Sequence, residues 1–145
     1  MIDIRSIITY TLSFFIVTIV AIYGLNLPSI ITGQQQLVTQ YYHQNWKFYI
    51  PFDWVLIAIY LILGLYVADK FLGAKTFLGK IGGIILTTIL ISGIFYIYFI
   101  NQPPSESFFN QWFHRAGFKA VLYDVILLCL VYMCFHLLNE CYQKW

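Results

Sequence analysis

Residues 119–138 read "KAVLYDVILLCLVYMCFHLL" and form an almost unbroken apolar run. A helix of this length spans about 30 Å, which is the thickness of the hydrocarbon core of a bilayer. Three further apolar runs of similar length occupy residues 7–27, 51–70 and 81–100. The alternating apolar and polar segments that are typical of membrane strands do not occur in the sequence. We therefore predict an all-α integral membrane protein with four transmembrane helices packed as an antiparallel bundle.

The composition of the chain favours the same class. Hydrophobic residues make up 61% of the chain and charged residues only 10%, whereas about 25% of the residues of a soluble domain are charged. The four runs and their links account for nearly the whole chain, so we expect a single membrane domain over residues 1–145. The first run is long for the apolar part of a signal peptide, and we interpret it as a membrane helix. The net charge of +2 and the scattered basic residues give no reason to expect a nucleic-acid partner.

The number of spans and the basic residues together predict a topology. Four spans place both termini on one side of the membrane, together with the short link at residues 71–80, which predicts a helical hairpin. Basic residues are more frequent on that side, and this distribution favours cytosolic termini. The basic residues are Arg5, Lys70, Lys75, Lys80 and Lys144 on the side of the termini, and Lys47, Arg115 and Lys119 on the opposite side.

Two aromatic segments fall together on the side opposite the termini. The first follows Pro28, which we expect to end the first helix. The second, at residues 105–116, places its rings at helical i, i+3 and i+4 spacing and predicts a short interfacial helix before the fourth span. Such rings either anchor a protein in the headgroup layer or contact another protein. The candidate contact residues are Tyr41, Tyr42, Trp46, Phe108, Phe109, Trp112, Phe113 and Arg115.

Asp124 lies one turn inside the apolar part of the last run, and a carboxylate at this position suggests function. In a helix Gly117, Ala120 and Asp124 share one face, so the carboxylate should face another helix rather than lipid. The functional interpretation is a proton or ion site. A structural carboxylate, bonded to a Tyr or Trp or paired with a cation, is favoured over it, because the middle of the membrane lacks further polar residues.

Other polar and small residues have mainly structural interpretations. Asp53 is expected near the start of the second helix, where the helix dipole favours a carboxylate. His136 lies on a different face from Asp124 and is interpreted as a helix-end histidine at the membrane interface. Gly83 and Thr87 have the small-x-x-x-small spacing of helix packing.

The sequence offers no pattern that is typical of catalysis or metal binding. Cys129, Cys134 and Cys141 lie on the last helix at spacings that do not suit a disulfide, and the C-x-x-C motif of thiol redox enzymes is missing. Cys129 and His136 are too few ligands for a metal. We expect no enzymatic activity, no metal and no cofactor.

The segment "FFNQWFHRAGFKAVLYDVILL", residues 108–128, combines an aromatic approach, the pair Ala116–Gly117, and Tyr123–Asp124 before an aliphatic run. This pattern resembles small multi-span inner-membrane virion proteins of large icosahedral (nucleocytoplasmic) DNA viruses, whose virions enclose a lipid layer beneath the capsid. The resemblance covers about one seventh of the chain. It implies a non-enzymatic structural or assembly protein of the virion internal membrane that contacts capsid proteins or sister membrane proteins.

Two alternative functions remain open on the sequence. One is an accessory subunit of a respiratory or photosynthetic complex in an organelle inner membrane. The other is a small transporter or membrane enzyme that uses Asp124 together with Asp53.

Overall fold

The computed structural model describes residues 2–144, and every regular element within them is a helix. Four helical segments are long and apolar enough to cross a membrane, as predicted. They are α1 (Ile4–Val17) continued by the π-helical η1 (Thr18–Gly24), α4 (Trp46–Lys70), α5 (Phe77–Ile100) and α7 (Phe118–Gln143). The shorter elements are α2 (Leu27–Thr32), α3 (Gln35–Thr39), the π-helical η2 (Gln40–Gln44) and α6 (Phe108–Ala116).

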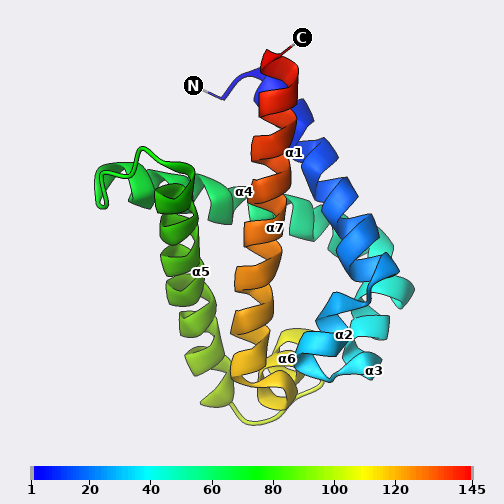
Figure 1. Cartoon of the computed structure of the whole chain (residues 1–145). Helices are drawn as coiled ribbons and strands as arrows, with labels where there is room; N and C mark the ends of the chain where they lie inside the picture. The colour runs from blue at the N-terminus through cyan, green and yellow to red at the C-terminus, as the bar shows by residue number, and fades with distance from the viewer. Residues whose placement is uncertain (1, 145) are drawn as a thin grey trace.

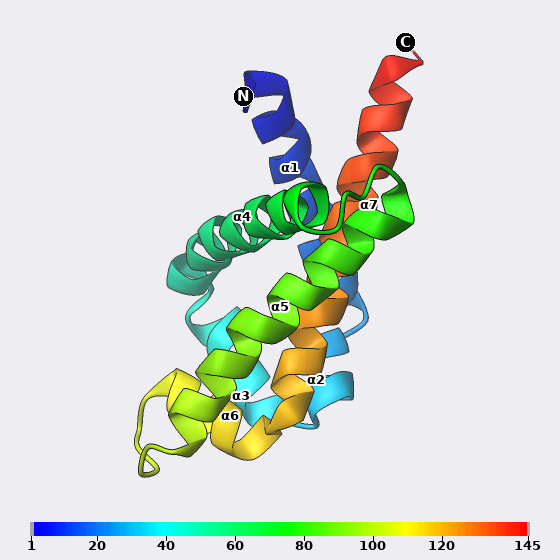
Figure 2. The same ribbon diagram turned by 90° about the vertical axis from the view of Figure 1, so that its left-hand side faces the viewer.

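The long helices do not form a simple antiparallel bundle. Helix α7 is central and packs against both α1 and α5, and these three helices run alongside one another (Figure 1). Helix α4 lies across them instead, as the two views in Figures 1 and 2 show. The predicted bundle is therefore wrong for α4. Both termini lie at one end of the molecule, and α2, α3 and α6 lie at the other; the turn between α4 and α5 lies at one side, nearer to the termini (Figure 1).

Small residues explain where α4 and α5 meet. The two helices contact each other closely near their joined ends, where Gly64 faces Ile84 and Gly83 faces Ala68. A Cβ atom on Gly83 would lie only 2.5 Å from the Ala68 Cβ, so this glycine serves the packing expected from its spacing. Toward their other ends both helices carry bulky rings, including Phe52 and Phe99, and no comparable glycine contact occurs there. The pair therefore meets at one end and diverges at the other.

Proline and asparagine set helix boundaries that differ from those predicted. The first long helical segment ends at Gly24, before the left-handed Asn26 (φ 52°), and Pro28 lies in the first turn of α2 instead of ending the first helix. The second predicted span begins at residue 51, but α4 begins at Trp46 and contains Pro51 inside it. Proline lacks the N–H that would bond one turn back, so α4 lacks one backbone hydrogen bond near its start.

The links opposite the termini are folded rather than extended. Residues between the first two spans form α2, α3 and η2, which the sequence did not indicate. The predicted interfacial helix exists as α6, but it starts at Phe108 rather than at residue 105. Ser105 lies before it, with its backbone N–H donating to Asn110 Oδ1 at 3.0 Å. We call α2, α3, η2 and α6 together the cap.

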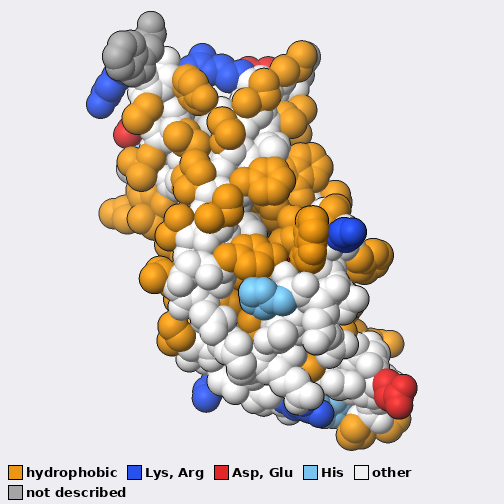
Figure 3. Space-filling model, turned by 90° about the vertical axis from the view of Figure 1, so that its right-hand side faces the viewer, with side chains coloured by type: hydrophobic (Ala, Val, Ile, Leu, Met, Phe, Trp, Pro, Cys, Tyr) orange, Lys and Arg blue, Asp and Glu red, His pale blue; other side chains and the backbone are white. Residues whose placement is uncertain are grey.

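The surface shows a broad apolar zone. On the face drawn in Figure 3, hydrophobic side chains gather over the upper and middle parts of the molecule, and charged side chains lie mainly toward its two ends. Large apolar side chains such as Ile94 (66% exposed) and Ile19 (61% exposed) point outward along the long helices. This distribution suits contact with lipid tails, because exposed apolar area of this extent is rare on soluble monomers.

Candidate binding cavity

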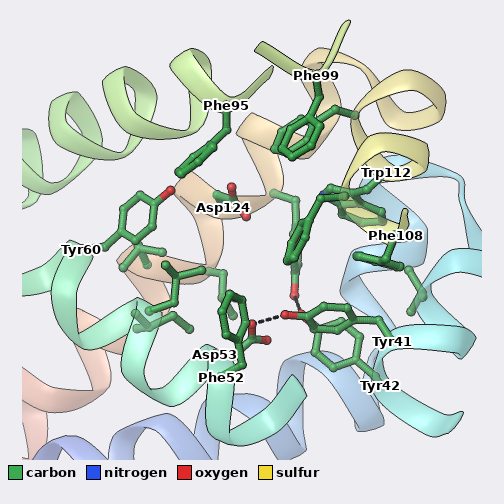
Figure 4. A pocket seen from close by; sticks show the side chains of 18 residues that line it. Tyr41, Tyr42, Phe52, Asp53, Tyr60, Phe95, Phe99, Phe108, Trp112 and Asp124 are labelled. Carbon is green, nitrogen blue, oxygen red and sulfur yellow. Dashed lines mark hydrogen bonds between the residues drawn. The ribbon is translucent and has the colours of Figure 1, made fainter. Parts of the chain in front are cut away.

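A cavity of about 190 Å³ lies where α4 and α5 diverge. Its walls come from the first half of α4, the last part of α5, the start of α7, and the cap elements η2 and α6 (Figure 4). Aromatic rings line most of it, and Phe52 and Phe95, which are 37% and 46% exposed, also contact the outside. The sequence did not predict this cavity, because it results from the crossing of α4 over the other helices.

Asp53 lines the cavity and is held by the cap. Its carboxylate Oδ1 accepts a hydrogen bond from the phenol of Tyr41 in η2 (Figure 4). Asp53 is the eighth residue of α4 and buried, so the expected stabilisation by the helix dipole is wrong, since that effect is confined to the first turn. Burial raises the pKa of Tyr41, because the phenolate would be poorly solvated there. Tyr41 therefore stays a proton donor to Asp53.

Asp124 enters the cavity from α7 and is held by α5 (Figure 4). The Ser92 hydroxyl donates to Asp124 Oδ2 at 2.7 Å, and the Tyr60 hydroxyl lies 2.9 Å from Ser92 Oγ. Because Ser92 has one proton and gives it to the carboxylate, it accepts from Tyr60. The resulting chain of hydrogen bonds connects α4, α5 and α7. The sequence predicted a protein-facing carboxylate bonded to a Tyr or Trp or paired with a cation. The hydroxyl that bonds Asp124 is instead that of Ser92, and Tyr60 bonds Ser92.

A third polar contact closes the cavity on the side of the cap. The hydroxyls of Tyr42 in η2 and Tyr123 in α7 lie 2.8 Å apart, and both side chains are buried (Figure 4). Burial raises the pKa of Tyr42 well above its ordinary value. This bond joins residues 81 positions apart in the chain. It therefore fixes the cap against α7.

The two carboxylates have no cationic partner among the described residues. The ion pairs found there are Lys70–Asp69 at 3.7 Å and His136–Glu140 at 3.3 Å, both outside the cavity. The basic residues predicted on the same side of the membrane, such as Lys47 and Arg115, are exposed. Residues 2–144 also contain no group of three or more His, Cys, Asp or Glu that could hold a metal ion. Hydroxyl groups alone hold Asp53 and Asp124.

The residues predicted on the Asp124 face have different roles. Ala120 is fully buried, as expected for helix packing. Gly117 was also predicted to allow close approach of a helix, but a Cβ atom there would meet nothing within 4 Å. Its backbone has φ 61° and ψ −140° at the corner between α6 and α7, a conformation that glycine adopts far more readily than other residues. Gly117 is therefore a corner residue rather than a packing residue.

Two further predicted residues lie outside the cavity. His136 lies near the C-terminal end of α7 and stacks on Phe77, with ring centroids 4.6 Å apart. Thr87 is buried on α5, as a packing role requires, but its Oγ1 has no hydrogen-bond partner within residues 2–144.

The aromatic residues predicted as a partner surface are partly enclosed in the chain itself. Tyr41, Tyr42, Trp112 and Phe113 are buried, so the prediction that they contact a partner is wrong for this fold. The rings pack on one another because both links fold into short helices: Tyr41 stacks on Tyr49 at 4.0 Å, and Phe99 on Phe113 at 5.5 Å. Phe108 and Phe109 are partly buried in the same group, whereas Trp46 and Arg115 are exposed.

Comparisons of the chain with protein-family models, with curated proteins and with solved structures found no match.

Proposed function

We propose that the chain is an integral membrane protein that binds a small molecule in the cavity between α4, α5, α6 and α7. The observation that carries this proposal is that two carboxylates, Asp53 and Asp124, border one aromatic-lined cavity inside a set of membrane-length helices. A mostly apolar cavity with a few convergent polar groups is the usual form of a ligand site. Carboxylates at such positions in membrane helices commonly mark a substrate or ion pathway.

The size of the cavity argues against a purely structural role for these carboxylates. The cavity of about 190 Å³ has room for a small molecule beside both acids. A carboxylate that only joins helices needs no such space beside it. A small molecule in this space would contact both acids.

A blocking variant tests the proposal. The protein is reconstituted in phosphatidylglycerol nanodiscs and probed with two molecules of nearly equal shape, neutral tert-butylbenzene and cationic phenyltrimethylammonium. We expect at least one probe to raise the unfolding temperature of the parent protein, because a ligand that binds only the folded state stabilises it. Leu127→Trp should remove the shift, since Leu127 lines the cavity.

A matched control and a second blocking variant complete the experiment. Leu122→Trp introduces the same ring on an exposed side of α7 and should keep the parent response. If circular dichroism shows that Leu127→Trp does not fold, Leu56→Trp blocks the same cavity from α4. Absence of any shift with both probes, or an unchanged shift in the blocked variant, would reject the binding function.

The side of the membrane on which the termini lie is part of the same proposal, and we place them in the cytosol. Cys141 is exposed near the C-terminal end of α7. In intact cells it should react with a membrane-permeant maleimide but not with an impermeant one. Reaction with the impermeant reagent would show that the C-terminus lies outside the cell, and the assigned topology would be wrong.

A second candidate function is that of a structural or assembly protein in a membrane-containing assembly, such as a virion with an internal membrane. The exposed side chains of Trp46 (50%) and Phe48 (68%) at the start of α4, beside Lys47, favour contact with a capsid protein or a sister membrane protein. Cross-linking of purified virions should then join Lys47 to another virion protein. Recovery of the chain only from respiratory or photosynthetic membranes would favour an accessory subunit instead.

A further inference from the structure

We infer that the ligand of this cavity is a small organic cation, an ammonium group carried on an apolar body. This inference rests on the proposed binding function and adds the charge and chemical class of the ligand. Its basis is the number of carboxylate oxygens that remain without a partner, the absence of a nearby cation among the described residues, and the aromatic lining.

Each carboxylate uses only one oxygen in hydrogen bonding. Tyr41 bonds Oδ1 of Asp53, and Ser92 bonds Oδ2 of Asp124. The other oxygens, Asp53 Oδ2 and Asp124 Oδ1, accept no hydrogen bond from the residues that the structure describes, and neither is a fully enclosed atom. Both residues line the cavity. Two carboxylate oxygens are therefore open to charge–charge contact with a cation inside it.

The charge of these groups determines the sign of the ligand. A carboxylate in apolar surroundings is strongly destabilised unless a cation or a proton neutralises it. Within residues 2–144 neither Asp53 nor Asp124 has a basic side chain within ion-pair distance. A cationic ligand would supply the missing charge, whereas an anionic ligand would be repelled by both acids.

The rings select an organic cation over a metal ion. The cavity walls include Phe95, Phe108 and Trp112, whose faces attract ammonium groups and also cover an apolar body. A hard metal ion requires about six oxygen ligands, and such a shell is not available from two carboxylates surrounded by rings. An alkylammonium or arylammonium molecule satisfies both parts of the lining.

The same two probes test this inference. In phosphatidylglycerol discs, which contain no amine, phenyltrimethylammonium should bind at least tenfold more tightly than tert-butylbenzene. Asp53→Asn and Asp124→Asn should each reduce this preference several-fold, because the amide keeps the shape of the side chain and removes the charge. Asp69→Asn, at the exposed end of α4, should leave the preference unchanged.

The possible outcomes separate the two proposals. Equal affinity for both probes in the parent protein would overturn the cation inference and leave the binding function in place. Binding of neither probe would reject the binding function itself. The ratio in the parent is compared with that in Leu127→Trp in the same anionic discs, which corrects for attraction of the cation to the lipid surface. Poor folding of an aspartate variant therefore does not prevent a decision.

The cation could belong to a free molecule or to a lipid headgroup, and a competition distinguishes them. Phosphatidylcholine added to the discs should displace phenyltrimethylammonium if a choline headgroup enters the cavity. Unchanged affinity in such discs would assign the site to free cations.

Discussion

Gly83 offers the most direct test of the crossing between α4 and α5. In Gly83→Ala the new methyl group would lie 2.5 Å from Ala68 Cβ and 2.8 Å from the Gly64 carbonyl oxygen. The second contact is with backbone, so no side-chain rotation relieves it, and the helices must separate by roughly 1 Å to reach ordinary contact distances. Overpacking of this kind costs about 1–3 kcal/mol. The measurement is the free energy of unfolding in detergent micelles, followed by circular dichroism.

The adjacent glycine provides the control. Gly82 lies on the same helix, but a Cβ atom there would meet nothing within 4 Å. Replacing either glycine by alanine adds the same intrinsic helix preference, which cancels when Gly83→Ala is compared with Gly82→Ala. The difference between the two variants then reports the contact alone. Equal stability of the two variants would show that α4 and α5 do not approach each other as the structure describes.

Four further outcomes are expected. Gly117→Ala should lower the free energy of unfolding by about 1–3 kcal/mol, since its positive φ strains any side chain although space is available. Tyr42→Phe should cost about 1–3 kcal/mol by leaving the Tyr123 hydroxyl buried without a partner, and adding Tyr123→Phe should recover most of this loss in a double-mutant cycle. Thr87→Val should stabilise the fold by roughly 1 kcal/mol, because it removes a buried hydroxyl that has no partner. Because burial raises the pKa of Tyr41 and Tyr42 in the folded state, the contribution of these two phenols to the free energy of unfolding should be constant below about pH 10 and fall above it, where the unfolded phenols ionise first. A pH titration of unfolding should show this fall, and it should be shallower in Tyr42→Phe; a stability that rises with pH there would contradict the burial of both phenols.

The class of the fold could be predicted from the sequence because membrane-length helices are local features. In lipid, an apolar run of about 20 residues must form a helix, because only a helix satisfies all its backbone hydrogen bonds within the segment itself. This holds whatever its neighbours are. All four such helices are present in the structure. The ends of these helices were less predictable, because a proline can follow a helix, lie in its first turn or lie just inside it. Pro28 lies in the first turn of α2, and Pro51 lies inside α4.

The arrangement of the helices depends on contacts between residues that are far apart in the sequence. The apolar runs do not show which of these residues meet. Gly83 was a candidate for packing, but nothing in the spacing of α5 alone shows that Gly64 and Ala68 of α4 would meet it. The direction of α4 follows from that meeting point. The folding of the link into α2, α3 and η2 likewise depends on rings, such as Tyr41 and Phe108, that find each other across long separations in the chain.

The candidate site was predictable only in its acids. Asp124 and Asp53 stand out because charges are rare in apolar runs, and both line the cavity. Tyr60 is one of twelve tyrosines in the chain and does not stand out among them. Ser92 carries no such signal either, since a serine or threonine hydroxyl in a membrane helix commonly bonds to its own backbone. Thr88, four residues before Ser92, does so by donating to the Ile84 carbonyl oxygen at 2.7 Å. The difference between these two hydroxyls depends on which one faces α7.

The close approach of α4 to α5 and the cavity are consequences of one packing arrangement. Because the glycines bring the two helices together at one end, the rings at the other end diverge and leave space that the cap encloses. The hydrogen bonds from Tyr60 through Ser92 to Asp124 lie between the contact and the cavity, on three different helices. A change in the crossing of α4 therefore moves Tyr60 relative to Asp124. On this argument Gly83→Ala should weaken cation binding as well as stability, although Gly83 does not line the cavity, whereas Gly82→Ala should change neither.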